Sequence, residues 1–311
     1  MKKTPIIAVV GPTASGKSEL AVSLAEKLDG EVISFDSMQI YKGMHIASAA
    51  PNHEEMRGIP HHLVEFLEPS ESFSVAEFLK LAKAKTEEIT KRGKRVIIAG
   101  GTGLYINSFL DNIIFTQSET DQSMREELNR EFDRVGAEEM LRRLKEFDPE
   151  TANRLHPNNK KRIIRAFEIY ETTGQTMTEQ LESSRAEESP YEPYMIGLTY
   201  FDRECLYDRI NLRVDKMLEK GLLDEAKGAF KGEGSKTSVQ AIGHKELFGY
   251  IKGECSLSEA VELLKMQTRR YAKRQLTWFK RDERISWIYR DIVSNTTEEA
   301  IKILEGKGYF E

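Results

Sequence analysis

The chain has few cysteines and no long apolar run. Among its 311 residues there are two cysteines, Cys205 and Cys255, and neither stands in a C-x-x-C or Cys/His pattern. Two isolated thiols exclude a disulfide framework and are typical of a reducing compartment. No apolar stretch approaches the ~20 residues of a membrane-spanning helix, so we expect no membrane partner. Met1–Pro5 leads directly into an apolar segment without the pattern of a signal peptide, so we expect a cytoplasmic protein.

A large excess of charge of either sign is also lacking. The formal net charge is −5, which excludes a protein that coats nucleic acid without selection but allows a local basic surface. The six histidines are scattered except for His61-His62, and adjacent residues point to opposite sides of a strand. We expect packing or hydrogen bonding there, not a metal site. The length allows two domains, or one domain with a large insertion.

The most informative segment is Gly11-Pro12-Thr13-Ala14-Ser15-Gly16-Lys17-Ser18, which has the spacing G-x-x-x-x-G-K-S. An apolar, β-branched segment (6–10) precedes it, and an amphipathic helical pattern (19–28) follows. In such a loop backbone N–H groups converge on a diphosphate, the lysine adds positive charge and the serine hydroxyl binds Mg²⁺. The following helix adds its positive N-terminus. The motif predicts a diphosphate site and does not identify the ligand as ATP; its other interpretation is a plain strand-to-helix turn.

Strands that alternate with helices predict an α/β fold. Helical patterns separate the expected strands, which are 6–10, 31–35, 95–99, 195–201, 285–289 and, as a further candidate, 62–66. This order predicts a P-loop NTPase-like core whose parallel sheet is flanked by helices. Strand patterns vanish between 115 and 194, where helical periods cover 123–134, 137–146 and 160–172. We therefore expect a core in two parts, 1–114 and 195–311, and an all-helical insertion domain, 115–194.

Ligands bind beyond the carboxyl ends of parallel strands, so the loops there are the candidate site. Asp36 follows one buried strand and suits a general base, a magnesium ligand or a hydrogen-bond acceptor for substrate; a turn or helix-cap aspartate is the structural alternative. Gly100-Gly101-Thr102 follows another strand, where many nucleotide hydrolases carry a magnesium-binding aspartate. The glycines allow close backbone approach, and Thr102 can bind a phosphate oxygen; a tight turn is the alternative.

Basic residues cluster in two places. The segment 265–281 holds seven basic residues and no acidic one, with Arg269, Arg270, Lys273 and Arg274 repeating at i, i+4 and aromatic residues between them. Such a stripe can neutralise RNA phosphates, or it can be a solvated face. A second cluster is Lys160-Lys161-Arg162-Ile163-Ile164-Arg165. Two basic patches on an acidic chain favour one extended polyanion. Arg209 and Arg213 share a helix face, for which a solvated, salt-bridged surface is the default expectation.

Together these segments resemble the tRNA dimethylallyltransferase family, over essentially the whole chain. The matching stretches follow the order of the chain: Gly11–Ser18; Asp36–Tyr41 with Lys42-Gly43-Met44; Gly58–Leu63; Gly100–Tyr105; His156-Pro157-Asn158 with Arg162 and Arg165; Ala241-Ile242-Gly243 with Lys245-Glu246; and Thr268–Arg281. The phosphate loop alone is shared with a vast superfamily, whereas the other segments in this order are specific.

The resemblance implies transfer of a dimethylallyl group from dimethylallyl diphosphate to N6 of the adenosine 3′-adjacent to the tRNA anticodon. It implies Asp36 as general base, Gly11–Ser18 with Mg²⁺ (a ligand being Ser18) on the diphosphate, and Thr102 and Arg213 on the departing group. Residues implied to contact the anticodon stem-loop are Asp36, Ser37, Met38, Gln39, Thr102, Arg125, Lys161, Arg162, Ile163, Ile164 and Arg165, to which the stripe adds Arg269, Arg270, Lys273 and Arg274. The resemblance also implies that the insertion domain 115–194 binds tRNA. We expect a monomer.

The sequence departs from the family pattern at two places. Ile46–Pro51 has Ala50 where a lysine is usual, and His244 stands where tyrosine is common. The main rival is a P-loop small-molecule or nucleotide kinase, which would need neither basic patch. Prenyl transfer to free AMP or ADP would not need the stripe, and a non-catalytic RNA-binding module would leave Asp36, Thr102 and Arg213 without a role.

Overall fold

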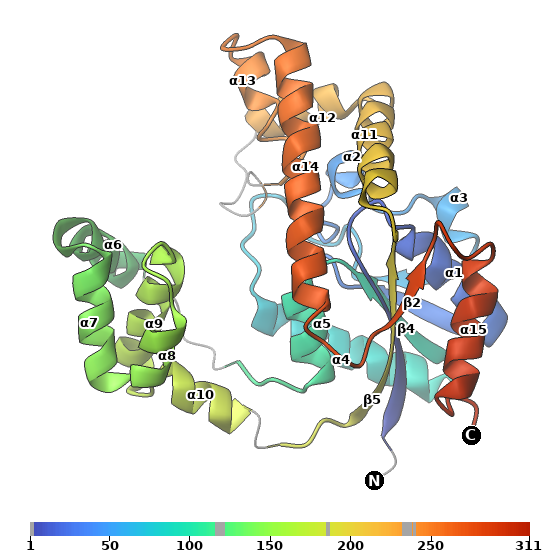
Figure 1. Ribbon diagram of the computed structural model, residues 1–311, viewed down its shortest axis with the longest axis horizontal. Coiled ribbons are helices and arrows are strands. Elements are labelled where there is room, and N and C mark those ends of the chain that lie inside the picture. The colour runs from blue at the N-terminus through green and yellow to red at the C-terminus, as the bar shows by residue number, and fades with distance from the viewer. Residues whose placement is uncertain (1–2, 116–121, 185–186, 232–237, 239–240) are drawn as a thin grey trace. The chain divides into compact units, whose positions relative to one another are not determined.

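A computed structural model of the chain describes residues 3–115, 122–184, 187–231, 238 and 241–311. Within these ranges six parallel strands form one sheet in the order β3-β2-β4-β1-β5-β6 (Figure 1). The strands are β1 (Thr4–Val10), β2 (Gly30–Ser34), β3 (His61–His62), β4 (Arg95–Gly100), β5 (Tyr191–Thr199) and β6 (Ser286–Tyr289). The predicted parallel α/β core is confirmed.

The chain divides into two compact units, one of Met1–Leu110 with Pro190–Glu311 and one of Asp111–Ser189. The helices of the first unit are α1 (Lys17–Leu28), α2 (His45–Ser48), α3 (His53–Met56), α4 (Val75–Lys91), α5 (Gly103–Leu110), α11 (Arg203–Glu219), α12 (Leu222–Lys231), α13 (Phe248–Ile251), α14 (Leu257–Phe279) and α15 (Thr296–Gly306). Those of the second are α6 (Gln122–Val135), α7 (Ala137–Phe147), α8 (Pro149–Arg154), α9 (Lys160–Thr173) and α10 (Met177–Ser184). The assignment of domains to functions stays a prediction. No described helix combines the length and apolar character needed to cross a membrane.

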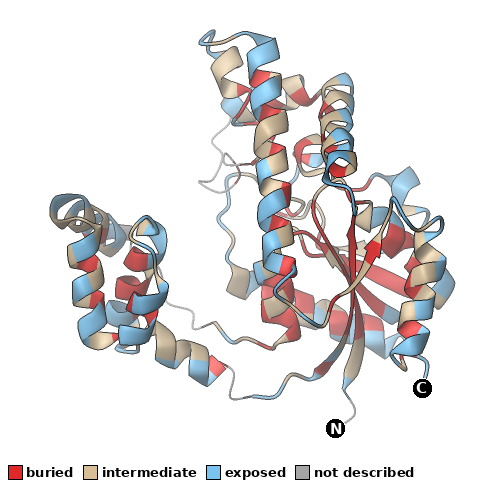
Figure 2. Cartoon of the chain, viewed as in Figure 1, coloured by how far each residue is buried: buried red, intermediate tan, exposed pale blue. Residues whose placement is uncertain are grey.

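The central strands are buried on both faces of the sheet. Ile6–Val10 is wholly buried, because α1 and α15 cover one face while α4 and α5 cover the other (Figures 1 and 2). A strand covered on both faces reads as a continuous apolar run instead of an alternation. On the second face Phe35 meets Phe78 and Phe109 edge to face, with ring centroids 4.9 and 5.1 Å apart. The separate helical unit has its own core of apolar residues from α6, α7, α8 and α9.

Strand β5 begins at Tyr191, so the predicted start at 195 was four residues too late. Pro193 and its charged neighbour Glu192 conceal the start of this strand in the sequence, since proline is excluded from central strands. In the structure Tyr191–Pro193 pairs with β1, whereas β6 pairs only with Ile196–Thr199. At Pro193 the strand therefore has one neighbour, and the missing N–H breaks no ladder.

The candidate strand 62–66 is also corrected, because β3 ends at His62. Leu63 and Glu65 have φ values of 60° and 47°, which turn the chain out of the extended conformation. The two histidines form hydrogen bonds, as predicted. His61 Nδ1 lies 2.8 Å from the carbonyl oxygen of Ile59, and His62 Nε2 lies 2.6 Å from Glu31 Oε2.

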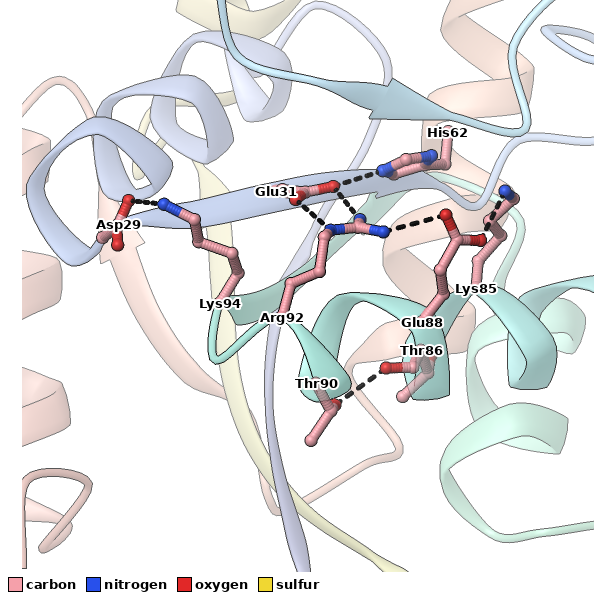
Figure 3. A network of polar contacts seen from close by, with 9 residues as sticks. All are labelled: Asp29, Glu31, His62, Lys85, Thr86, Glu88, Thr90, Arg92 and Lys94. Carbon is pink, nitrogen blue, oxygen red and sulfur yellow. Dashed lines mark hydrogen bonds and ion pairs between the residues drawn. The ribbon is translucent and has the colours of Figure 1, made fainter.

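Glu31 is the centre of a polar network at the start of β2 (Figure 3). Its buried carboxylate accepts hydrogen bonds from Arg92 at 2.7 and 3.2 Å and lies against His62, while Arg92 also pairs with Glu88. Burial raises the pKa of Glu31, but the hydrogen bonds from Arg92 and His62 outweigh burial and hold that pKa below its ordinary value. The ionised carboxylate thus ties β2 to β3 and to the segment after α4.

We expect Glu31→Gln to lower the free energy of unfolding by about 1–3 kcal/mol at pH 7, because the amide cannot satisfy both cationic donors. Since the folded-state pKa of Glu31 is lowered, its stabilisation is present above the unfolded value of about 4.3 and is lost as the pH falls through the folded value. Urea unfolding at pH 7 and in acid measures this.

The matched control is Glu87→Gln, whose carboxylate is 70% exposed and 3.9 Å from Lys91 Nζ. It should change stability little at either pH. If Glu31→Gln changed the free energy of unfolding equally at both pH values, the assignment of a buried, ionised Glu31 would be contradicted.

Candidate active site

Three loops meet because β2, β4 and β1 are neighbours in the sheet. Ser34 is in register with Ala99, and Gly100 is in register with Val10, so the carboxyl ends of the three strands lie at one edge. Asp36 follows β2, Gly100 ends β4, and the phosphate loop follows β1. The expectation that these loops share one edge of the sheet is confirmed.

The phosphate loop leads into α1 through Gly16, whose φ of 87° favours glycine. Gly16 is the N-cap of α1 and supplies no side-chain oxygen to the helix, which leaves the N-terminus open to an anion. Lys17 Nζ donates to the carbonyl oxygen of Pro12 at 2.7 Å. Arg290, the residue that follows β6, donates to the carbonyl oxygen of Ser15 at 3.2 Å and so holds the loop against the end of that strand.

A cavity of about 330 Å³ lies beyond this edge. The phosphate loop, the Asp36 loop, the end of β4 and helices α11 and α14 all contribute to its wall. Its polar and charged lining residues are Thr13, Lys17, Ser18, Asp36, Ser37, Gln39, Ser48, Arg213, Lys245, Thr268, Tyr271, Arg274 and Gln275. The predicted residues Asp36, Lys17, Ser18 and Arg213 are therefore brought together around one space.

Two partly buried cations, Lys17 and Arg213, dominate the electrostatics of this cavity. Burial lowers the pKa of Lys17 to about 8; Asp36 opposes this shift and Arg213 adds to it. Burial also lowers the pKa of Arg213, again opposed by Asp36. Two partly desolvated cations beside one carboxylate are incompletely neutralised. An anion that carries several charges, such as a diphosphate, would complete the balance.

Asp36 is held by the turn that follows it. Its Oδ1 accepts a hydrogen bond from the backbone N–H of Met38 at 2.9 Å, which is the turn role that the sequence left open, while its carboxylate also faces the cavity. Thr102 lies on the neighbouring loop, and its role at the departing group stays a prediction. Its hydroxyl accepts from the backbone N–H of Ser37 at 3.1 Å, and it is absent from the described lining of the cavity. Thr102 thus contacts the Asp36 loop directly.

Short helix α2 forms another wall, with Ala47, Ser48 and Ala49 on the cavity. Gln39 donates to the carbonyl oxygen of Ala49 at 2.9 Å and accepts from Ser34 at 2.7 Å, so its amide is occupied by the chain itself.

Glu225 of α12 fixes the other end of α2. It accepts from the backbone N–H groups of Ile46 and Ala47, both at 2.9 Å, and lies 2.8 Å from Nε2 of the fully buried His244. The unusual His244 is therefore part of the support of the cavity wall.

Arg209 is exposed, as expected of a solvated helix face. It lines, with Arg213, Lys216 and Lys220, an adjoining cavity of about 550 Å³ that also touches Ala14 and Gly16 of the phosphate loop. No ion pair of Arg209 or Arg213 is found among the described residues. One face of α11 is therefore basic where it approaches the phosphate loop.

The stripe on α14 has members with different surroundings. Arg270 and Lys273 are exposed, Arg269 donates to Asn211 of α11 at 2.6 Å, and Arg274 lies over the ring of Tyr271 at 5.6 Å. The stripe therefore includes an inter-helix contact and a cavity residue as well as free surface.

In the helical unit Lys161 and Arg162 are exposed at the start of α9. Ile163 and Ile164 are 0% and 3% exposed in the core of this unit, so their predicted contact with tRNA is corrected to a packing role. The apolar period of the helix turns them inward. Glu168, with 5% of its side chain exposed, pairs with Arg125 at 2.9 Å and with Arg165 at 3.3 Å.

Comparisons with known proteins agree with this geometry. The family model described as IPP transferase matches residues 39–282. A tRNA dimethylallyltransferase from Bacillus licheniformis is 52% identical over 286 residues, which are 92% of this chain and 90% of the relative. The chain belongs to the IPP transferase family. Another relative of the same name, from a Thermoanaerobacter species, is 47% identical over 97% of this chain and 98% of its own length.

Solved structures of IPP transferases share the fold. The tRNA isopentenylpyrophosphate transferase from Bacillus halodurans has a TM-score of 0.72 and 42% identity, over 99% of this chain and 96% of that one. A eukaryotic dimethylallyltransferase acting on tRNA has a TM-score of 0.81 and 28% identity, over 99% and 79%. The likeness therefore includes both the core and the helical unit.

Sequence reasoning missed the cavity face of α14 in this IPP transferase. Leu264, Thr268, Tyr271 and Gln275 line the cavity at spacings of four, three and four residues. This is the period of one helix face. In the sequence this period is less conspicuous than the basic stripe on other faces of the same helix. Burial and the charge of Asp36 raise the pKa of Tyr271, so its hydroxyl stays protonated near neutral pH.

The site fits Mg²⁺ held jointly with a substrate. The described residues contain no cluster of three or more His, Cys, Asp or Glu side chains suited to a metal ion. Mg²⁺ is commonly bound through one or two protein oxygens, with water and substrate phosphates completing its shell. Ser18 lines the cavity beside Lys17, where the phosphates of a donor would lie.

We expect Glu225→Gln to destabilise this enzyme by about 1–3 kcal/mol, because it replaces a charged acceptor shared by two backbone N–H groups and His244. Thermal or urea unfolding measures the change. Asp224→Asn, a neighbouring substitution at a side chain that is 83% exposed, is the control and should leave stability nearly unchanged. Equal effects of the two substitutions would show that Glu225 does not anchor α2.

Proposed function

We propose that this IPP transferase moves a dimethylallyl group from dimethylallyl diphosphate to N6 of the adenosine 3′-adjacent to the anticodon of tRNA, with the cavity residues in the following roles. The observation that carries the proposal is that Asp36, Lys17 and Arg213 line one cavity. A carboxylate for an amine and cations for a diphosphate are there within reach of one another. The proposed roles need no residue of a second copy, and we propose a monomer as the functional unit.

Asp36 acts as general base on the acceptor. The N6 amine of adenine is a poor nucleophile because its lone pair is delocalised into the ring. As N6 forms its bond to C1 of the dimethylallyl group, the amine loses a proton to the Asp36 carboxylate. The hydrogen bond from Met38 N–H holds one carboxylate oxygen, which orients the other. Proton transfer to a positioned base contributes about 10²–10⁴-fold to a rate.

Lys17 and Arg213 act on the leaving group. The bond between C1 and the diphosphate oxygen breaks, and the diphosphate leaves with the electron pair. Positive groups already in place where that charge develops stabilise the transition state without reorganisation. Mg²⁺ bound with Ser18 would neutralise further charge on the diphosphate. Thr102 supports this step indirectly, because its contact is with the Asp36 loop.

The anticodon stem-loop binds basic surfaces that are found on each of the two units. Arg270 and Lys273 present exposed cations on α14, and Lys161 and Arg162 do so on α9. Glu168 holds Arg125 and Arg165 in fixed positions on the helical unit. Phosphate contacts of this kind position the RNA, and the target base leaves its stack to enter the cavity.

A direct transfer assay tests the function. The chain is incubated with Mg²⁺, radiolabelled dimethylallyl diphosphate and unmodified tRNA that carries the target adenosine, with AMP, or ATP and kinase acceptors, in parallel tubes. Label in tRNA at that adenosine is the expected result. Label in AMP alone would reject the tRNA acceptor, and consumption of ATP without prenyl transfer would favour the kinase alternative.

Asp36→Asn should lower the single-turnover rate of transfer by about 10²–10⁴-fold, because the amide cannot accept the proton. Binding of tRNA, measured by filter retention, should stay within several-fold of the original. Ser48→Ala, at the α2 wall of the cavity, serves as a control that leaves the proton acceptor in place. Near-normal turnover of Asp36→Asn would remove Asp36 from the mechanism.

The double substitution Arg270→Ala with Lys273→Ala should weaken tRNA binding and flatten the dependence of log K on log salt by about 1–2. These two cations are chosen because Arg269 is engaged with Asn211. Lys302→Ala on α15, at a side chain that is 70% exposed, is the control for a lost surface charge. An unchanged salt slope in the double variant would identify the α14 stripe as a solvated face.

A further inference from the structure

Gln275 has both ends of its buried amide engaged by two different loops. The residue lies in α14 and is 5% exposed. Its Oε1 accepts a hydrogen bond from the backbone N–H of Thr13 at 2.8 Å, and its Nε2 donates to the carbonyl oxygen of Gly101 at 3.0 Å. Thr13 belongs to the phosphate loop, and Gly101 to the loop after β4. One side chain from a third element therefore connects them.

The connection continues to Asp36. Gly101 is followed by Thr102, whose hydroxyl accepts from the backbone N–H of Ser37, the residue after Asp36. A chain of hydrogen bonds thus runs from the phosphate loop through Gln275 to the turn that carries the carboxylate. The two reacting groups would be held at opposite ends of this chain, the donor diphosphate at one end and the acceptor amine at the other.

The fit at Gly101 is close. A Cβ atom at this position would lie 2.1 Å from Gln275 Nε2, so a side chain there would displace the amide. Gly101 has no left-handed φ, and its lack of a side chain is therefore explained by this approach. The hydrogen-bond chemistry is equally restrictive. A carboxylate would place an acceptor against the carbonyl oxygen of Gly101, and asparagine is one methylene shorter.

We propose that Gln275 is a positioning residue that sets the distance between the diphosphate-binding loop and the Asp36 loop. The inference rests on the proposed function, which assigns the donor to one loop and the proton acceptor to the other. Each substrate keeps its own binding groups when Gln275 is changed. The expected loss is therefore in the alignment of C1 with N6, and a misplacement of about 1 Å can cost up to about 10²-fold in rate.

The first test compares Gln275→Glu and Gln275→Ala with the parent chain at saturating tRNA and dimethylallyl diphosphate. We expect kcat to fall about 10–100-fold, while the Kd values for the donor and for tRNA, measured separately, change less than about threefold. Gln267→Glu is the matched control, since Gln267 is on the same helix and outside the described lining of the cavity; its kcat should be unchanged. A kcat for Gln275→Glu equal to that of the parent would overturn the proposal.

A double-mutant cycle tests the contact itself. Gly101→Ala alone should lower kcat as Gln275→Ala does, because its Cβ would displace the amide. In the Gln275→Ala background there is no amide to displace, so Gly101→Ala should add almost no further loss. Multiplied effects would show that the two residues act separately, and a loss that appears wholly in donor Kd would reduce Gln275 to a donor-site residue; either result overturns the inference.

The parent chain in the same assay distinguishes a failure of the proposed function from a failure of the positioning role. If it transfers no label to tRNA, the proposed function fails and the comparison of variants has no basis. If it transfers label and the Gln275 variants do so at the same kcat, the function stands and only the positioning role is rejected. Circular dichroism melts confirm that each variant is folded at the assay temperature.

Discussion

The active site depends on the adjacency of three parallel strands. Because β2, β4 and β1 lie side by side, their carboxyl ends present the Asp36 turn, the Gly100-Gly101 turn and the phosphate loop at one edge. Gly100 is needed for this closeness, since a Cβ there would lie 2.1 Å from the carbonyl oxygen of Phe35. Where a nucleotide hydrolase would carry an acid, this chain has a glycine that lets two loops approach closely. Among the described residues that line the cavity, the one carboxylate is that of Asp36, which follows the neighbouring strand β2.

The charges around the cavity follow from this arrangement. Lys17 and Arg213 are partly buried, their desolvation lowers the pKa of each, and Asp36 opposes both shifts. Lys17 donates to a backbone carbonyl oxygen, that of Pro12, and not to a carboxylate. A diphosphate would stabilise both. The site therefore suits a substrate that carries several negative charges. These charges stay on the diphosphate when it leaves.

The sequence predicted the parts of the site that are encoded locally. The phosphate loop, the Asp36 turn and the Gly-Gly turn each have a short pattern, and the order of strands and helices predicted the sheet that assembles them. Gln275 could not be found in this way, because its partners are 174 and 262 residues away in the chain. Ile163 and Ile164 show the opposite error. A resemblance transferred a whole stretch to a binding role, although the apolar period of α9 already directed both side chains to the core.

Helix α14 unites two tasks on different faces. Leu264, Thr268, Tyr271 and Gln275 face the cavity, while Arg270 and Lys273 are exposed. A helix of 23 residues moves largely as one body, and α14 packs along α11, which carries Arg213. An RNA backbone bound to the exposed cations would therefore contact the same element that holds the phosphate loop and the Gly101 loop together. With both proposed roles on α14, one helix determines where the tRNA binds and how far apart the reacting groups lie. The position of Gln275 on α14, and not on either loop that it joins, fits this dual role.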